Sequence, residues 1–168
     1  MRAVRFLGGL VAAVLATVGF GALGFPSPPD FFLIPVADLA RTGAPIAAML
    51  AGLAAGLIED LFLVPGRLLG LHAFSKVLVG YLLATLGARM VVEKPAGVGG
   101  LLAGAVIVES AILVLLLWVL RGDPIAPHPL LLLTRAAITG LLGAGIHAAA
   151  RFPWRARNLA RRRRRLLS

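Results

Sequence analysis

Five long apolar runs recur along this chain, and they restrict its fold more than any other feature. They cover residues 6–23, 46–64, 69–90, 98–120 and 130–150. Each has about 20 residues, the length that an α-helix needs to cross the roughly 30 Å hydrocarbon core of a bilayer. Because 60% of the 168 residues are hydrophobic and only 14% are charged, a water-soluble domain is excluded. The sequence predicts an all-α integral membrane protein.

A sixth, shorter segment lies between the first two runs. Residues 26–30 contain three prolines followed by Asp30, which should end the first helix and cap the next. Residues 31–41 would cover only about 16 Å as a helix, so we expect a short, tilted or partly re-entrant span that is buried in protein. The predicted fold is therefore a polytopic bundle of about six transmembrane segments, the second one short.

The distribution of basic residues predicts the orientation of this bundle. With six segments and both termini in the cytoplasm, thirteen of the 17 Lys and Arg residues lie on the cytoplasmic side, whereas Arg67 and Arg121 lie on the other. Cytoplasmic loops of membrane proteins carry such an excess of Lys and Arg. We expect residues 1–150 to form the transmembrane bundle, with an uncleaved first helix, and residues 151–168 to form a basic cytoplasmic tail.

The tail carries most of the net charge of +10. Trp154 is expected to lie at the membrane surface, and the consecutive arginines should attract anionic lipids at roughly 1 kcal/mol per charge; these are Arg161, Arg162, Arg163, Arg164 and Arg165. An acidic protein partner would use the same electrostatics. Because the positive charge is concentrated at this one end, membrane anchoring explains it better than nucleic-acid binding does.

Small residues and a charge share one face in each of two neighbouring spans. Gly52, Gly56 and Asp60 lie at four-residue intervals in one span, and Lys76 and Gly80 do so in the next. Residues four apart lie on the same face of a helix, so these faces should pack closely. We expect an Asp60–Lys76 ion pair across the hairpin, because pairing lowers the cost of burying either charge. The pair has either a purely structural role or a further one.

Three other charges lie inside the apolar runs. Glu59 is about 100° from Asp60 around the helix, so it is expected to face lipid headgroups or water. Glu109 is near the middle of its run and must face the bundle or be neutral; one such residue is weak support for a proton or cation relay. Arg135 belongs to a polar stripe on the last span, and we expect it to pair with Glu59 or Asp60.

Sequence patterns typical of enzymes are absent. The chain has no cysteine, no HExxH or GxSxG pattern, no phosphate-binding glycine loop and no histidine pair with metal-ligand spacing. We therefore predict no catalytic residues, no metal site and no cofactor.

Short motifs follow one another in a defined order along the chain: Pro29-Asp30, Gly52 with Gly56-Leu57, Asp60-Leu61, Leu69-Gly70 with Phe74, and Gly80-Tyr81-Leu82. This ordered set resembles the bacterial rod shape-determining protein family MreD. The length, the number of spans and the basic C-terminus fit the same family. The crowded prolines of residues 26–29 depart from its pattern.

This resemblance implies a non-enzymatic, multi-pass protein of the bacterial inner membrane. Proteins of this family are scaffolds of the cell-elongation machinery that bind MreC. Through MreC they are linked to the elongation glycosyltransferase and transpeptidase, and they are also linked to MreB filaments. The residues expected to hold a partner-binding or structural shape are Gly52, Gly56, Asp60, Gly70, Lys76 and Gly80.

The family fold is also similar to the substrate-binding subunits of energy-coupling-factor vitamin transporters. That similarity supports an alternative, a membrane subunit that encloses a small molecule or lipid-linked precursor near Glu59, Asp60 and Arg135. The chain has few aromatic residues to stack on a ring, which makes the alternative the weaker hypothesis.

Overall fold

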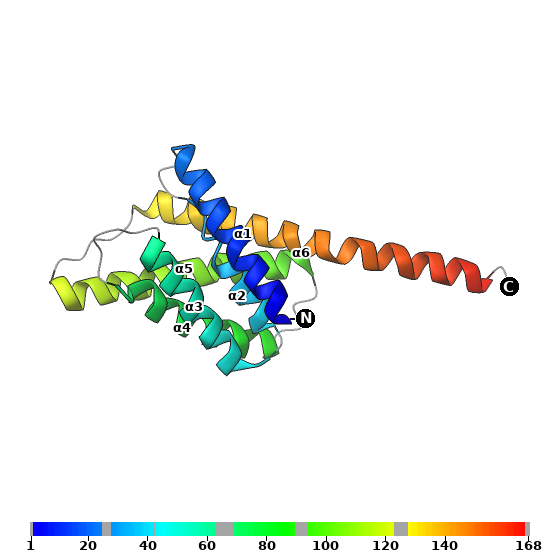
Figure 1. Cartoon of the computed structure of the whole chain (residues 1–168), viewed down its shortest axis with the longest axis horizontal. Helices are drawn as coiled ribbons and strands as arrows, with labels where there is room; N and C mark the ends of the chain where they lie inside the picture. Colours follow the sequence, from blue (N-terminus) through cyan, green and yellow to red (C-terminus); the bar gives the residue numbers. More distant parts are fainter. Residues whose placement is uncertain are drawn as a thin grey trace.

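The computed structural model describes residues 2–24, 28–41, 43–62, 69–89, 94–122 and 128–166, without the side chains after Ala150. Across these ranges the regular structure is entirely α-helical, with no strand, which confirms the predicted all-α architecture (Figure 1). The helices are α1 (Arg2–Ala22), α2 (Leu33–Ala40), α3 (Pro45–Phe62), α4 (Leu71–Arg89), α5 (Pro95–Arg121) and α6 (Pro129–Leu166).

Three of these helices contain segments long and apolar enough to cross a membrane: Ala3–Ala22, Pro95–Arg121 and Pro129–Ala150. In each, fewer than a third of the residues in the most apolar window are buried inside the bundle. A large apolar surface therefore faces outward, as a bilayer-embedded protein requires.

Helix α2 is the shortest element and the most buried one. Its eight residues cover about 12 Å, which is too short to cross a bilayer as a helix. Phe32, Leu33 and Val36 are almost completely buried. The residues before it, from Pro28 to Asp30, are not helical. The predicted short span is thus a half-length helix with an extended entry, enclosed by the other helices.

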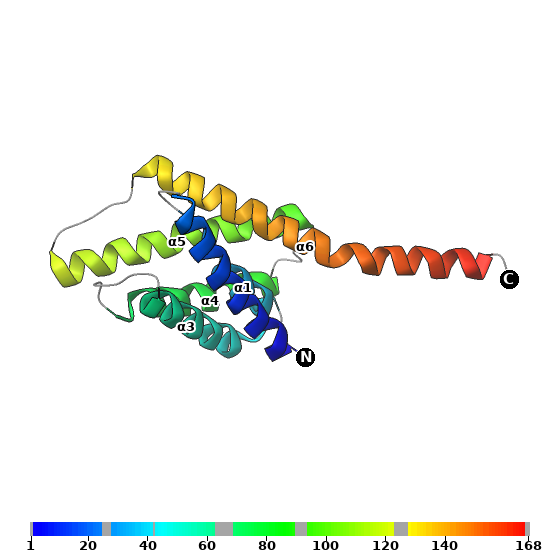
Figure 2. The same ribbon diagram turned by 45° about the horizontal axis from the view of Figure 1, so that its top comes forward.

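Three pairs of consecutive helices are antiparallel. Gly9 of α1 lies against Pro35 of α2, and the Phe20 ring lies 5.1 Å from the Phe31 ring, so these two helices are antiparallel. Helices α3 and α4 are also antiparallel, as are α5 and α6. Figures 1 and 2 show α5 and α6 side by side and α6 projecting beyond the bundle to the C-terminus. The tail therefore begins as a continuation of the last helix.

Glycines let α3 and α4 approach each other closely. A Cβ atom on Gly52 would overlap the backbone of Lys76, one on Gly56 would overlap Ala73, and one on Gly80 would overlap the Ala48 carbonyl. The predicted small faces of these two spans therefore pack against each other within the chain. Close backbone contact of this kind gains dispersion energy that larger side chains would prevent.

Candidate functional site

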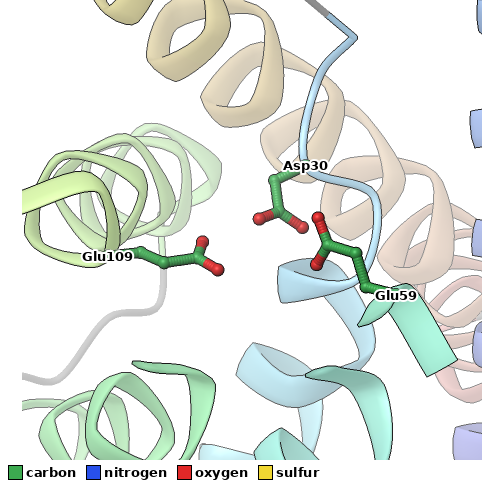
Figure 3. Close-up of side chains that lie close together, drawn as sticks. All are labelled: Asp30, Glu59 and Glu109. Carbon is green, nitrogen blue, oxygen red and sulfur yellow. The ribbon is translucent and has the colours of Figure 1, made fainter. Parts of the chain in front are cut away.

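The ammonium group of Lys76 is the centre of a buried charged cluster. The residue is completely buried in the first half of α4. Its Nζ lies 2.6 Å from Asp30 Oδ2, 2.5 Å from Glu109 Oε1 and 3.0 Å from Glu59 Oε2. Figure 3 shows these three carboxylates pointing toward one another from different parts of the chain. One cation thus links the entry to α2 with α3, α4 and α5.

Asp30 has two roles, of which the sequence indicated one. Its Oδ1 accepts hydrogen bonds from the N–H groups of Phe32 (3.0 Å) and Leu33 (3.1 Å), so it caps the start of α2 as predicted. Its Oδ2 lies 2.6 Å from Lys76 Nζ and 3.2 Å from Arg135 Nη2. Capping fixes the side chain in the orientation that lets its second oxygen meet both cations.

Helix α6 joins the cluster through its polar stripe. Arg135 Nη2 donates to Asp30 and lies 4.0 Å from Glu59 Oε1. One turn further, the Thr139 hydroxyl donates to the Arg135 carbonyl at 2.8 Å and accepts the Asp30 N–H at 2.9 Å. Helix α6 therefore provides a cation for the Asp30 carboxylate and a hydrogen-bond acceptor for the Asp30 backbone N–H. Buried polar groups need such partners.

The position of Glu59 differs from the one expected, and it adds a third carboxylate to the cluster. It was expected to face headgroups or water, yet only 9% of its surface is exposed. Its carboxylate lies 3.0 Å from Lys76 Nζ of α4 and 4.0 Å from Arg135 Nη2 of α6, so it points into the bundle. The side chains of Glu59 and Arg135 keep 11% and 23% of their surfaces exposed, and they mark the side on which the cluster is least enclosed.

Formal charges in the cluster do not cancel. Asp30, Glu59 and Glu109 face the two cations Lys76 and Arg135, which leaves an excess of one negative charge when all five are ionised. Oxygens of the three carboxylates lie within 4.8 Å of one another, a spacing that a metal ion could use. The Lys76 ammonium already contacts all three groups, so a metal would have to displace it. The chain supplies its own cation here.

Asp60 has different partners from the one predicted for it. Its carboxylate accepts hydrogen bonds from the N–H groups of Gly70 (2.9 Å), Ala73 (3.2 Å) and His72 (3.3 Å). It also lies 2.8 Å from His72 Nδ1. The predicted Asp60–Lys76 pair is wrong, because Asp60 caps the N-terminus of α4, where free N–H groups and the helix dipole favour an anion.

Gly70 makes this capping geometry possible. Its φ of +100° lies in the region that favours glycine, and its N–H points to Asp60. The six residues predicted to hold a partner-binding or structural shape thus all occupy contacts within the chain, around the α3–α4 hairpin.

The cluster brings together residues that the sequence had kept apart. Glu109 was expected to face the bundle or be neutral, with no partner named for it, and Asp30 was expected only as a cap; both contact Lys76. A signal was present, since few acids interrupt the apolar runs and each must find a partner. Arg67 and the side chains of Trp154 and Arg161–Arg165 lie outside the described part of the structure.

Comparisons with protein-family models, with curated proteins and with solved structures found no match for this chain.

Proposed function

We propose that this protein is a non-enzymatic, multi-pass scaffold of the bacterial inner membrane. It belongs to the cell-elongation machinery, binds MreC and supports peptidoglycan synthesis and rod shape. Both termini lie in the cytoplasm, and six segments cross or enter the membrane. MreC links it to the elongation glycosyltransferase and transpeptidase, and the complex is connected to MreB filaments.

The observation that supports this proposal is the role of the motif residues. Among the residues that carry the resemblance to the MreD family, Asp30 and Asp60 cap helices, and Gly52, Gly56 and Gly80 lie at helix contacts. The remaining motif side chains are mostly exposed, as at Leu61, Leu69, Phe74, Tyr81 and Leu82. A set of residues that shapes a rigid bundle suits a protein whose task is to present a surface. The buried ion pairs have the same effect, since they link helices rather than face a substrate.

A transport subunit is the second candidate. It is favoured by the partly enclosed side of the charged cluster, where the Arg135 Nε atom is buried and makes no hydrogen bond. A carboxylate or phosphate of a ligand would suit that atom. Binding of such a ligand would raise the melting temperature, because it stabilises the native state.

Affinity purification of the tagged protein from native membranes in mild detergent, followed by mass spectrometry, tests the two candidates. Recovery of an MreC-like protein and cell-wall synthases supports the scaffold. Recovery of paired ATPases and a coupling membrane protein instead supports the transport subunit. An unrelated tagged membrane protein of similar size, purified in parallel, is the control for nonspecific recovery.

A variant sharpens this test. Asp60→Ala removes the cap of α4 and is expected to reduce the recovered MreC-like partner several-fold, because the hairpin loses its shape. Asp38→Ala is the matched control, since Asp38 is exposed on α2 and caps no helix in the described structure. Unchanged recovery and normal cell shape with Asp60→Ala would contradict a role for the capped hairpin in partner binding.

A further inference from the structure

We infer that the bundle binds an anionic phospholipid in a groove between α1, α2, α5 and α6. The groove is a cavity of about 560 Å³. Its lining includes Arg5, Ala16, Asp38, Arg41 and His147 but none of the members of the charged cluster around Lys76. It is therefore a separate site, and the inference does not depend on the identity of any protein partner.

One end of the groove is basic. Arg41 Nη1 lies 2.7 Å from His147 Nδ1, which joins the end of α2 to α6. Arg5 lies four residues before Gly9, and Arg41 lies six residues after Pro35. Because Gly9 contacts Pro35 and the two helices are antiparallel, both guanidinium groups lie toward the same end of the bundle.

The rest of the groove is apolar and extends along the helices. Ala12, Ala13 and Ala16 line it from α1, and Leu102 lines it from α5. Ala16 lies eleven residues beyond Arg5, which is roughly 16 Å along a helix. A groove with charge at one end and a long apolar wall matches a lipid, which has a polar head and a hydrocarbon chain.

The groove has the volume of a small-ligand site. Small-ligand sites measure roughly 300–1,000 Å³, so the groove fits one extended hydrocarbon chain with part of a headgroup.

Charge at the basic end selects the headgroup. Arg5 and Arg41 outnumber Asp38 among the ionic residues that line the groove, so the end is positive with His147 neutral. Arginine pairs well with phosphate oxygens, often through two parallel hydrogen bonds. A lipid with net negative charge should therefore bind better than a zwitterionic lipid with the same chains.

The test measures the melting temperature of the full-length protein in detergent with added phosphatidylglycerol or phosphatidylcholine of identical chains. Phosphatidylglycerol is expected to raise the melting temperature by roughly 4 °C more than phosphatidylcholine. The Arg5→Gln/Arg41→Gln variant should lose most of that difference and keep only the part that the basic tail contributes. Ala12→Phe should lose the effect of both lipids, because the ring fills the groove from an exposed position.

Two control variants keep the test specific, since the basic tail also attracts anionic lipid in every variant. Arg121→Gln removes an exposed charge outside the groove, and Ala22→Phe adds a ring on an exposed α1 position outside it; both should respond like the natural protein. The inference is wrong if the control variants lose as much of the lipid-induced rise in melting temperature as the groove variants do. It is also wrong if both lipids raise the melting temperature of the natural protein equally. An equal rise with inorganic phosphate alone would show an anion site instead. If the double variant folds poorly, the Arg5→Gln variant is measured in its place. Arg5 is exposed, so its replacement should not impair folding.

Discussion

Two carboxylates adjacent in sequence, Glu59 and Asp60, are stabilised in different ways. Glu59 joins the cluster around Lys76, whose members come from four helices and the entry to α2. Asp60 accepts N–H groups from the start of the next helix, 10 to 13 residues away. The first network connects α3, α4, α5 and α6 with the entry to α2, whereas the second stabilises one hairpin.

The difference shows what a buried charge contributes in a small membrane bundle. A capping carboxylate takes the place of water at a helix N-terminus. The N–H groups that it accepts belong to that helix, so they are in place as soon as the helix forms. A buried ion cluster satisfies its charges only when several helices are correctly placed, so it penalises any other arrangement. Specificity of this kind is expected to be lost as a unit when the central cation is removed.

Lys76→Met should have the largest effect. It leaves three buried carboxylates facing Arg135 alone, and breaking a buried pair by removing one partner costs about 3–5 kcal/mol. We expect a large fall in folded yield and a lower melting temperature, measured by size-exclusion chromatography and thermal unfolding in detergent. Lys94→Met is the matched control, because Lys94 is exposed at the start of α5. A variant as stable as the natural protein would refute the central role of Lys76.

Asp60→Asn should have a smaller and more local effect. The amide oxygen still accepts an N–H, but the charge-assisted hydrogen bonds weaken, and bonds to a charged group contribute about 1.5–3 kcal/mol each. Hydrogen exchange should accelerate at residues 70–73 and remain slow in α5 and α6. Asp38→Asn, at an exposed carboxylate, should change neither. Equal acceleration across all helices would mean that the hairpin is not an independent unit.

Glu109→Gln should have the smallest effect, less than about 1 kcal/mol. The carboxylates exceed the cations by one, so this change balances the formal charges of the cluster. The amide oxygen can still accept a hydrogen bond from the Lys76 ammonium group. Thermal unfolding of Glu109→Gln beside Lys76→Met measures the contrast directly. A loss as large as that of Lys76→Met would show that the charge of Glu109 is needed in full.

The local features of this protein were predictable from its sequence. Periodicity and length predicted the helical class, the short second segment and the small faces of α3 and α4, because these depend on residues a few positions apart. The cap formed by Asp30 follows from the proline break and the apolar residues after it. In each case the physical cause lies within one helix or one turn.

The partners of the buried charges were decided only by the tertiary structure. Lys76 lies 46 positions from Asp30 and 33 from Glu109, and no periodicity relates residues so far apart. The sequence determined that each buried acid needs a partner, because an unpaired charge is costly in an apolar interior. Which partner it found, and where a groove remained open, depended on how the six helices packed, since only packing fixes distances between helices.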